Sequence, residues 1–151
     1  MRRSWKKWGM IRDYALLKTL DLISKEPMHG YGILKHLEEE FGIKLSPGLL
    51  YPVLRKMVDM GLATASETSI DGKRAIIYEI TPMGREFLEQ RRSVLEVFER
   101  KALRIKQCRL HELATRLRFF FVNIDKIREE DLLKLREAVD RFLEDTRFIG
   151  V

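Results

Sequence analysis

Apolar side chains recur at helical spacing in three segments near the start of the chain, at 13–25, 29–41 and 46–60. Pro27 separates the first two predicted helices, because the residue before a proline avoids the helical backbone conformation. The pattern therefore predicts three short helices, each with one apolar face that has to be buried in a shared core.

The ends of the first two helices are marked in the sequence. Asp13 is the expected N-cap of the first helix, and Gly42 follows the second helix as its expected C-cap. Gly30 and Gly32 fall in the first turn of the second helix. They indicate either a loose helix start or a place where another backbone approaches closely.

The third predicted helix has clear start signals. Ser46 is a good N-cap, and Pro47 suits the first helical position. Pro52 lacks the amide hydrogen that a regular helix needs, so we expect an irregular first turn or a later start. The predicted buried face has apolar residues spaced at i, i+3, i+4 and i+7, namely Leu50, Val53, Leu54 and Met57.

Two segments of alternating character follow, at 62–69 and 74–80, and predict a pair of strands. Asp71-Gly72 between them is typical of a two-residue hairpin turn. Thr81 then begins another helix as its N-cap. Three helices followed by a hairpin are the order of a winged helix-turn-helix, which is most often a DNA-binding fold.

The rest of the chain is predicted to be helical, at 82–108, 110–122 and 129–145. The first of these helices carries a short heptad-like seam, and the last has one apolar face. The segment 119–122, Phe-Phe-Phe-Val, is apolar on every side, so we expect it to pack against the tail or a second subunit.

Length and composition fit one domain, or one small domain with a helical appendage: of 151 residues, 45% are hydrophobic and 34% charged. The formal net charge of +6 favours a polyanionic partner. The charge is unevenly spread, because residues 1–12 carry +5 and 100–118 carry +6, whereas 13–81 hold 8 basic and 10 acidic groups. A DNA contact by residues 13–81 must therefore depend on a few well-placed cations.

Other functional classes find little support in the sequence. Cys108, the one cysteine, excludes an internal disulfide and suits a reducing cytoplasm. The chain has no apolar run long enough for a membrane span and no signal-peptide pattern at its start. Cys108 and His111 supply only two potential zinc ligands, too few to close a site. With no catalytic motif present, we expect no enzyme activity, no metal and no cofactor.

The outward face of the third helix carries groups suited to DNA. Arg55 can bind a guanine edge or a phosphate, Tyr51 can donate to a phosphate, and Lys56 adds charge. Lys73 and Arg74 at the hairpin tip can straddle a phosphate backbone or enter a minor groove. Taken singly, the helix residues fit a solvated helix face better than a DNA contact. The turn residues alone are a weak signal, because exposed turns also carry charges for solubility. Their order along the chain favours DNA binding.

Two basic segments leave alternatives open. The N-terminal arm interleaves Trp5 and Trp8 with its cations, and either contacts phosphates or docks its tryptophans on a partner subunit. Residues 100–118 need an acidic partner, and the acids of the last predicted helix could pair with them within or across a dimer. We favour that pairing over a wider DNA footprint or an anionic ligand.

Several of these motifs, in this order and spacing, resemble the PadR family of winged-helix transcriptional regulators. The resemblance covers about residues 16–88, and residues 89–151 match only in being helical. The matching motifs are Pro27-Met28-His29-Gly30-Tyr31, Ser46-Pro47-Gly48-Leu49-Leu50-Tyr51-Pro52-Val53-Leu54, Gly61-Leu62, Asp71-Gly72, Tyr78 and Thr81-Pro82-Met83-Gly84.

The resemblance implies a homodimeric DNA-binding repressor with C-terminal dimerisation helices and a small-molecule effector of unknown identity. The residues then expected to form the dimer interface are Leu88, Leu95, Phe98, Ala102, Ile105, Leu135, Val139 and Phe142. Leu49 stands where the family often has Ser or Thr, and residues 75–78 stand where it often has two basic residues and two tyrosines. The residues then expected to meet DNA are Ser46, Gly48, Leu49, Tyr51, Arg55, Lys56, Lys73, Arg74, His29 and Tyr31.

The sequence thus predicts a mainly α fold with a small β-hairpin, a winged helix-turn-helix with C-terminal dimerisation helices. The predicted domains are a basic arm at 1–12, a DNA-binding domain at 13–81 and a helical dimerisation region at 82–151. We expect a cytoplasmic, sequence-specific repressor that acts as a homodimer on a pseudo-palindromic operator. The alternative is a winged-helix protein-interaction module without sequence-specific DNA binding.

Overall fold

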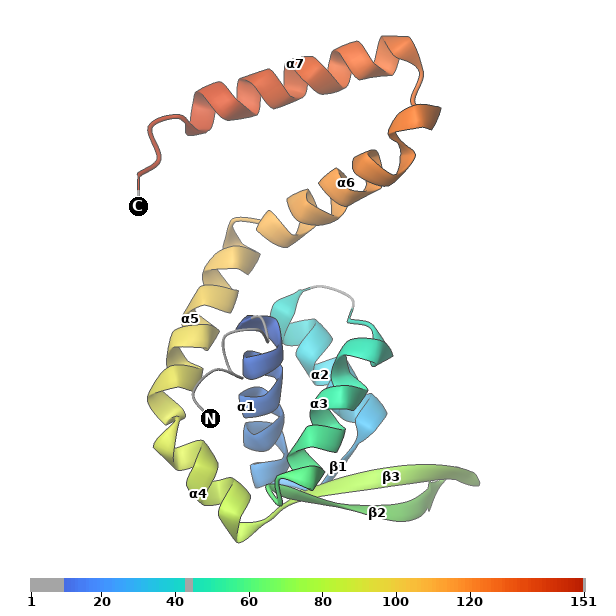
Figure 1. The fold of residues 1–151 in the computed structure, drawn as a ribbon, viewed down its shortest axis with the longest axis vertical. Coiled ribbons are helices and arrows are strands. Elements are labelled where there is room, and N and C mark those ends of the chain that lie inside the picture. The colour runs from blue at the N-terminus through green and yellow to red at the C-terminus, as the bar shows by residue number, and fades with distance from the viewer. Residues whose placement is uncertain (1–9, 43–44, 151) are drawn as a thin grey trace. The chain divides into compact units, whose positions relative to one another are not determined.

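The computed structural model of the chain describes residues 10–42 and 45–150. The chain divides into two compact units between His111 and Glu112. We call the described residues up to His111 the head and residues 112–150 the tail. Figure 1 shows the elements: α1 Met10–Lys25, β1 Met28–His29, α2 Gly30–Phe41, α3 Pro47–Asp59, β2 Ala63–Ile70, β3 Lys73–Ile80, α4 Pro82–Gln90, α5 Arg92–Gln107, α6 Leu110–Asn123, the 3-10 turn η2 Ile124–Lys126 and α7 Glu129–Thr146.

Helix α1 lies at the centre of the head, in contact with α2, α3, α4, α5 and β3. It begins at Met10, so Asp13 lies inside its first turn. The prediction that Asp13 is the N-cap is therefore wrong. Its apolar residues do not form one stripe but cover most of its circumference, because neighbours pack on several sides. The buried apolar residues of α1 are Tyr14, Ala15, Leu16, Leu17, Leu20 and Ile23.

The sheet has three antiparallel strands in the order β1-β3-β2. The hairpin runs in full register from Ala63 opposite Ile80 to Ile70 opposite Lys73. Its two-residue turn is the predicted one, since Asp71 and Gly72 have φ angles of 51° and 74°, as the favoured hairpin turns require. Strand β1 was not predicted, because a two-residue strand shows no alternation in the sequence.

The helix predicted at 82–108 is two helices, α4 and α5, separated at Arg91, whose φ and ψ of −119° and 15° are not helical. Thr81 caps α4 as predicted: its Oγ1 accepts a hydrogen bond from the Gly84 amide at 3.0 Å and donates to the Gly61 carbonyl at 2.6 Å. The break allows α4 and α5 each to pack an apolar face against α1.

The seam predicted for dimerisation is largely buried inside the head. Leu88, Leu95 and Ala102 belong to its hydrophobic core, and Phe98 packs against that core and meets the ring of Tyr14 at 5.9 Å between centroids. The compact head therefore includes α4 and α5 and extends past the boundary predicted at residues 81 and 82. Heptad spacing indicated an apolar face correctly, but the face is covered by this chain's own helices.

Ion pairs at the edge of the core join α1 to α5. The Lys18 ammonium lies 2.6 Å from Glu99 of α5 and 3.6 Å from Glu40 of α2. Asp21 accepts a hydrogen bond from Arg92 at 2.8 Å and one from Lys25 at 3.2 Å. Burial alone would raise the pKa of the Asp21 carboxyl, but these hydrogen bonds outweigh it and hold the pKa below its ordinary value.

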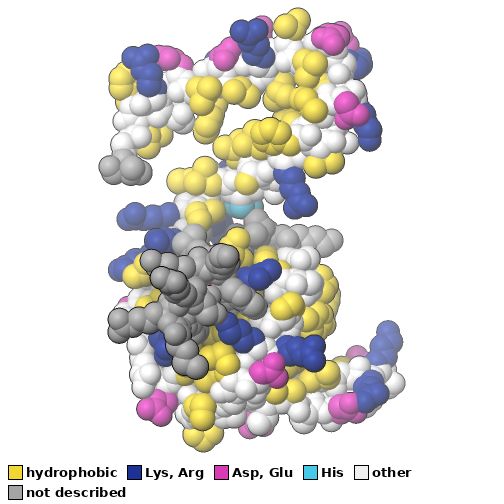
Figure 2. Space-filling view, in the orientation of Figure 1, with side chains coloured by type: hydrophobic (Ala, Val, Ile, Leu, Met, Phe, Trp, Pro, Cys, Tyr) yellow, Lys and Arg dark blue, Asp and Glu magenta, His cyan; other side chains and the backbone are white. Residues whose placement is uncertain are grey.

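In the tail, α6 and α7 contain no buried residue. Phe119, Phe121 and Val122 are exposed, and Figure 2 shows apolar side chains gathered over these helices. Acids of α7 pair with nearby bases: Asp131 lies 2.7 Å from Arg128, and Glu144 lies 3.2 Å from Arg147. These pairs join residues of the tail to one another, and the predicted pairing of the α7 acids with residues 100–118 stays a prediction.

Across residues 10–42 and 45–150, none of the helices combines the length and the apolar character that a bilayer crossing requires.

Gly84 is predicted to be the glycine that the head tolerates least well when substituted. A methyl group there would overlap the Leu62 carbonyl oxygen and stand 2.8 Å from Cγ1 of Ile80. Gly84→Ala should lower the free energy of unfolding by about 2–3 kcal/mol, measured by urea unfolding, although alanine is the better helix former. In the control, Gly48→Ala, the added methyl group would stand 4.0 Å from Oγ of Ser46, so the free energy of unfolding should stay unchanged or rise slightly. Equal stability of both variants would contradict the contact.

A second prediction concerns pH. Because the folded-state pKa of Asp21 lies below its unfolded value of 3.8, its stabilisation is present above that value and is lost as the pH falls through the folded pKa. Asp21→Asn should lower the free energy of unfolding at pH 7 by about 1–2 kcal/mol, and the difference from wild type should vanish in strong acid. Urea unfolding between pH 7 and pH 2 measures this, with the exposed Glu26→Gln as control. A constant difference at every pH would refute it.

Candidate nucleic-acid interface

Helix α3 divides sharply into a buried and an exposed face. All four residues predicted to point inward, Leu50, Val53, Leu54 and Met57, are fully buried. On the opposite face, Tyr51 is 51% exposed, and Arg55 is exposed as well. Helix α3 therefore presents a phenol and a guanidinium one turn apart to solvent, as the spacing predicts.

The first turn of α3 is irregular, as expected from Pro52. The amides of Leu49 and Leu50 both donate to the Ser46 carbonyl, at 3.0 and 3.4 Å, and Pro52 stands inside the helix without an amide hydrogen. Ser46 occupies the N-cap position, but its side chain makes no capping hydrogen bond. Ser46 and Gly48 are exposed, so the backbone at this end of α3 is accessible to a ligand.

The start of α2 brings further side chains beside α3. His29 is the N-cap of α2, and its Nδ1 accepts a hydrogen bond from the Gly32 amide at 2.9 Å. The imidazole stacks on Tyr31 at 6.4 Å between ring centroids, and the Lys35 ammonium lies 5.4 Å from the centre of the Tyr31 ring. Sequence reasoning missed the capping role of His29, because histidine is not among the usual N-cap residues. Tyr31 is 61% exposed.

Gly30 is the contact point between α2 and α3. A methyl group added there would stand 3.4 Å from Cε1 of Tyr51 and 3.6 Å from Cδ1 of Leu54. The first turn of α2 is therefore closely packed and not loose, although its neighbours are side chains of α3 and not another backbone. The Tyr51 ring therefore packs beside the first turn of α2, and Tyr51 nevertheless stays largely accessible.

The hairpin of β2 and β3 extends away from the helices (Figure 1). Lys73 and Arg74 are exposed near its tip, as predicted. Arg74, however, forms an ion pair with Glu67 on the neighbouring strand. Arg74 faces Ser69 across the hairpin, so Glu67 is its diagonal neighbour on the same face of the sheet. This β2–β3 hairpin, which is the wing of the fold, therefore offers less free positive charge than the sequence indicates.

The remaining candidates are less accessible. Leu49 and Lys56 are half-buried. Burial raises the pKa of the Asp13 carboxyl on α1, and the positive charge of Lys56 partly opposes this effect. Residues 1–9 of the predicted basic arm, with Trp5 and Trp8, lie outside the described residues, and Arg12 belongs to the first turn of α1.

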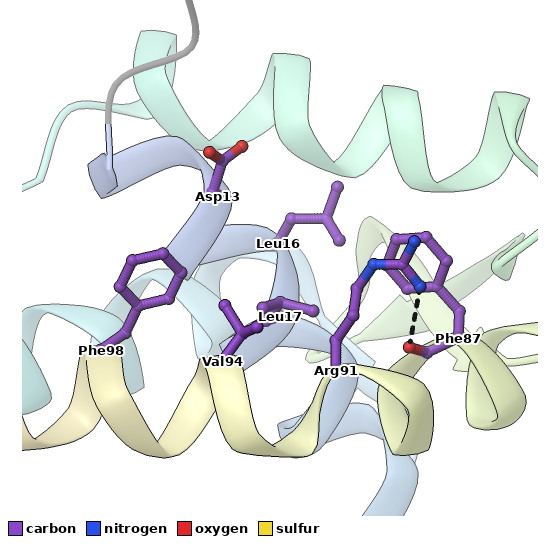
Figure 3. A pocket seen from close by; sticks show the side chains of 7 residues that line it. All are labelled: Asp13, Leu16, Leu17, Phe87, Arg91, Val94 and Phe98. Atoms are coloured by element: carbon purple, nitrogen blue, oxygen red, sulfur yellow. Dashed lines mark hydrogen bonds between the residues drawn. The ribbon is translucent and has the colours of Figure 1, made fainter. Parts of the chain in front are cut away.

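A small pocket lies between α1 and the α4–α5 pair (Figure 3). It encloses about 150 Å³. The Arg91 guanidinium lies 3.6 Å from the centre of the Phe87 ring and donates to the Phe87 carbonyl at 3.4 Å. The pocket thus combines apolar walls with one acidic and one basic group; its lining residues are Asp13, Leu16, Leu17, Phe87, Arg91, Val94 and Phe98.

The described part of the chain gathers no three His, Cys, Asp or Glu side chains in an arrangement that could hold a metal ion. The Cys108 thiol is exposed. The side chains that the structure does bring together at α3, the start of α2 and the hairpin are hydrogen-bond donors, cations and aromatic rings, which are the groups that proteins use to contact nucleic acids.

Comparison with known proteins agrees with this geometry. Residues 19–90 match the profile of the Transcriptional regulator PadR-like family. The Mycobacterium tuberculosis transcriptional regulator Rv3488 is 34% identical over 92 residues, which are 61% of this chain and 85% of the relative. The Escherichia coli transcriptional regulator YqjI is 32% identical over 87 residues, 56% of this chain but only 41% of that protein.

Solved structures show the same fold. The crystal structure of TA0346 from Thermoplasma acidophilum aligns with a TM-score of 0.54 and 26% identity over 65% of this chain and 95% of its own. A PadR family transcriptional regulator from Eggerthella lenta aligns with a TM-score of 0.51 and 23% identity, over 64% of this chain and 84% of its own. The predicted winged-helix fold class is thereby confirmed.

Proposed function

Because the chain belongs to the PadR-like family of transcriptional regulators, we propose that it controls transcription by binding DNA as a homodimer through α3 and the β2–β3 hairpin. The observation that carries this proposal is the division of α3 into a fully buried apolar face and an exposed face with Tyr51 and Arg55. A helix that is anchored on one side and bare on the other can enter a major groove without unfolding.

We assign the contacts by chemistry. Arg55 is placed in the middle of α3 and reads base edges, since a guanidinium can bind guanine bidentately. Tyr51 and Lys56 contact phosphates, and Lys73 and Arg74 do so from the wing. Around this centre, Ser46, Gly48 and Leu49 bring the first turn of α3 to the duplex, and His29 and Tyr31 extend the contact to the start of α2.

The homodimer is proposed because of the tail. Its helices leave apolar side chains exposed, with Phe121 at 80% and Leu143 at 59% exposure. Such surfaces are commonly covered by a partner. Of the predicted interface residues, Val139 and Phe142 remain accessible. A twofold dimer would place two α3 helices on half-sites about 34–36 Å apart, which favours a pseudo-palindromic operator and repression by occupancy.

A winged helix without DNA affinity is the competing function. Residues 13–81 carry 8 basic and 10 acidic groups, and the ion pair of Arg74 with Glu67 further reduces the positive charge of the wing. A protein-interaction module would show no salt-dependent binding to any duplex.

The small-molecule effector implied by the family resemblance would find apolar volume in the pocket of Figure 3. Its size of about 150 Å³ favours a small organic molecule with a charged group that pairs with Asp13 or Arg91.

Selection of bound fragments from a random duplex library by the purified full-length chain, at stated salt, tests the proposed function. Enrichment of one motif in two inverted halves is the expected result. Retention of no duplex at low salt would favour the protein-interaction module.

The first prediction from these contacts separates sequence reading from phosphate binding. Arg55→Ala should weaken binding to the selected operator about tenfold or more and reduce the preference over unrelated duplexes. Lys73→Ala should weaken all duplexes alike and flatten the slope of log K against log salt by about one. Gel-shift titrations at several salt concentrations measure both effects. Equal losses on operator and unrelated DNA for both variants would contradict the assigned roles.

The second prediction concerns the wing. Glu67→Gln should release Arg74 and remove a negative charge near the duplex, so that DNA binding becomes about two- to fivefold tighter at low salt. Glu79→Gln is the matched control, an exposed acid on β3 that lies farther from the tip, opposite Thr64. Unchanged or weaker binding by Glu67→Gln would show that Arg74 does not contact DNA.

A further inference from the structure

The outward face of α5 is apolar at its start and basic at its end. Val94, Val97, Lys101 and Arg104 follow one another along α5 at steps of three, four and three residues. The last three share one outward side of the helix, and Val94 lies at the edge of that side, where it also lines the pocket beside α1. All four are exposed. Within the described part of the head, neither Lys101 nor Arg104 has an ion-pair partner.

DNA bound by α3 is a poor candidate for this face. Helix α1 packs against both α3 and α5, and in the head it lies between them (Figure 1). The α5 side chains that point away from α1 therefore point away from the exposed face of α3 in the same head. A duplex lying on α3 would have to bend around the whole head to reach Lys101 and Arg104.

Helix α7 carries the complementary pattern. Leu132, Leu135, Val139 and Phe142 repeat the same steps of three, four and three residues, and none of them is buried. Acids flank this stripe at Asp140 and Asp145, and both are exposed. Asp140 lies 3.9 Å from Arg136, a long contact, and Asp145 has no ion-pair partner among the described residues.

We propose that α7 of a second copy of this chain packs on the outward face of α5. Its apolar stripe covers Val94 and Val97, and its acids Asp140 and Asp145 meet Lys101 and Arg104. This inference rests on the proposed homodimer and specifies its contact. In a twofold dimer each contact occurs twice, because α5 of each copy receives α7 of the other.

The apolar stripe and the ion pairs contribute differently to this contact. Burial of the apolar stripe drives association. The exposed ion pairs add little each, but they select which helix pairs with which, since like charges in the same place repel. This division explains why a strongly basic segment can persist on a helix that faces away from the proposed DNA-binding surface.

Reciprocal charge reversal tests the proposal in the full-length chain. Variant A carries Lys101→Glu and Arg104→Glu, and variant B carries Asp140→Lys and Asp145→Lys. Each variant alone should dimerise about tenfold or more weakly at low salt, because two repulsive pairs occur twice in the dimer. An equimolar mixture of A and B should recover a wild-type dissociation constant as a heterodimer, because every contact between A and B is again between opposite charges.

Sedimentation equilibrium at low and high salt measures the dissociation constants, and Lys126→Glu, an exposed base in η2, is the control for a charge change elsewhere. Thermal unfolding of each variant checks that the fold is kept. If A and B stay monomeric when mixed, yet a chain carrying all four changes dimerises, the contact lies within one chain and the proposal is overturned. Normal dimers of A with weaker DNA binding would assign Lys101 and Arg104 to nucleic acid instead.

The same measurements distinguish failure of the proposed homodimer from failure of the α5–α7 contact. A wild-type chain that stays monomeric at every concentration would refute the homodimer itself and the α5–α7 contact with it. A wild-type dimer that is insensitive to the changes in A and B would leave the homodimer standing and overturn only the contact assigned here.

Discussion

Burial of α1 is the constraint on which the head depends. Five other elements pack on this helix, and its apolar residues are distributed around it so that each neighbour finds a surface. Lys18 and Asp21 sit where that surface meets solvent and bind α5 through Glu99 and Arg92. Since ion pairs that are partly buried stabilise only when their geometry is good, they fix the position of α5 more than they add to the total stability.

That arrangement separates two tasks. The hydrophobic core holds α3 from one side, so the exposed side is free to vary in chemistry without loss of the fold. The close contact of Gly30 with Tyr51 links α2 to the same surface. The candidate interface is therefore a rigid platform with modest charge, and we expect its binding strength to depend on shape and hydrogen bonding as much as on net charge.

Much of this could be predicted from local patterns. The spacing of Leu50, Val53, Leu54 and Met57 specified the buried face of α3, and Asp71-Gly72 specified the hairpin turn. The pairing of Arg74 with Glu67 follows from that turn through the strand register, although it was not anticipated. The break at Arg91 has no glycine or proline to announce it, and an apolar seam such as Leu88, Leu95 and Ala102 does not say whether its cover comes from the same chain.

The absence of any buried side chain in α6 and α7 has a consequence for the cell. Isolated helices of this length are marginal in water, so such helices draw their stability from association. If association orders these helices, the protein concentration determines the fraction of dimers that can bind both half-sites at once. For the proposed dimeric repressor, operator occupancy would then respond to the square of the subunit concentration at low abundance, and a modest drop in synthesis would relieve repression disproportionately.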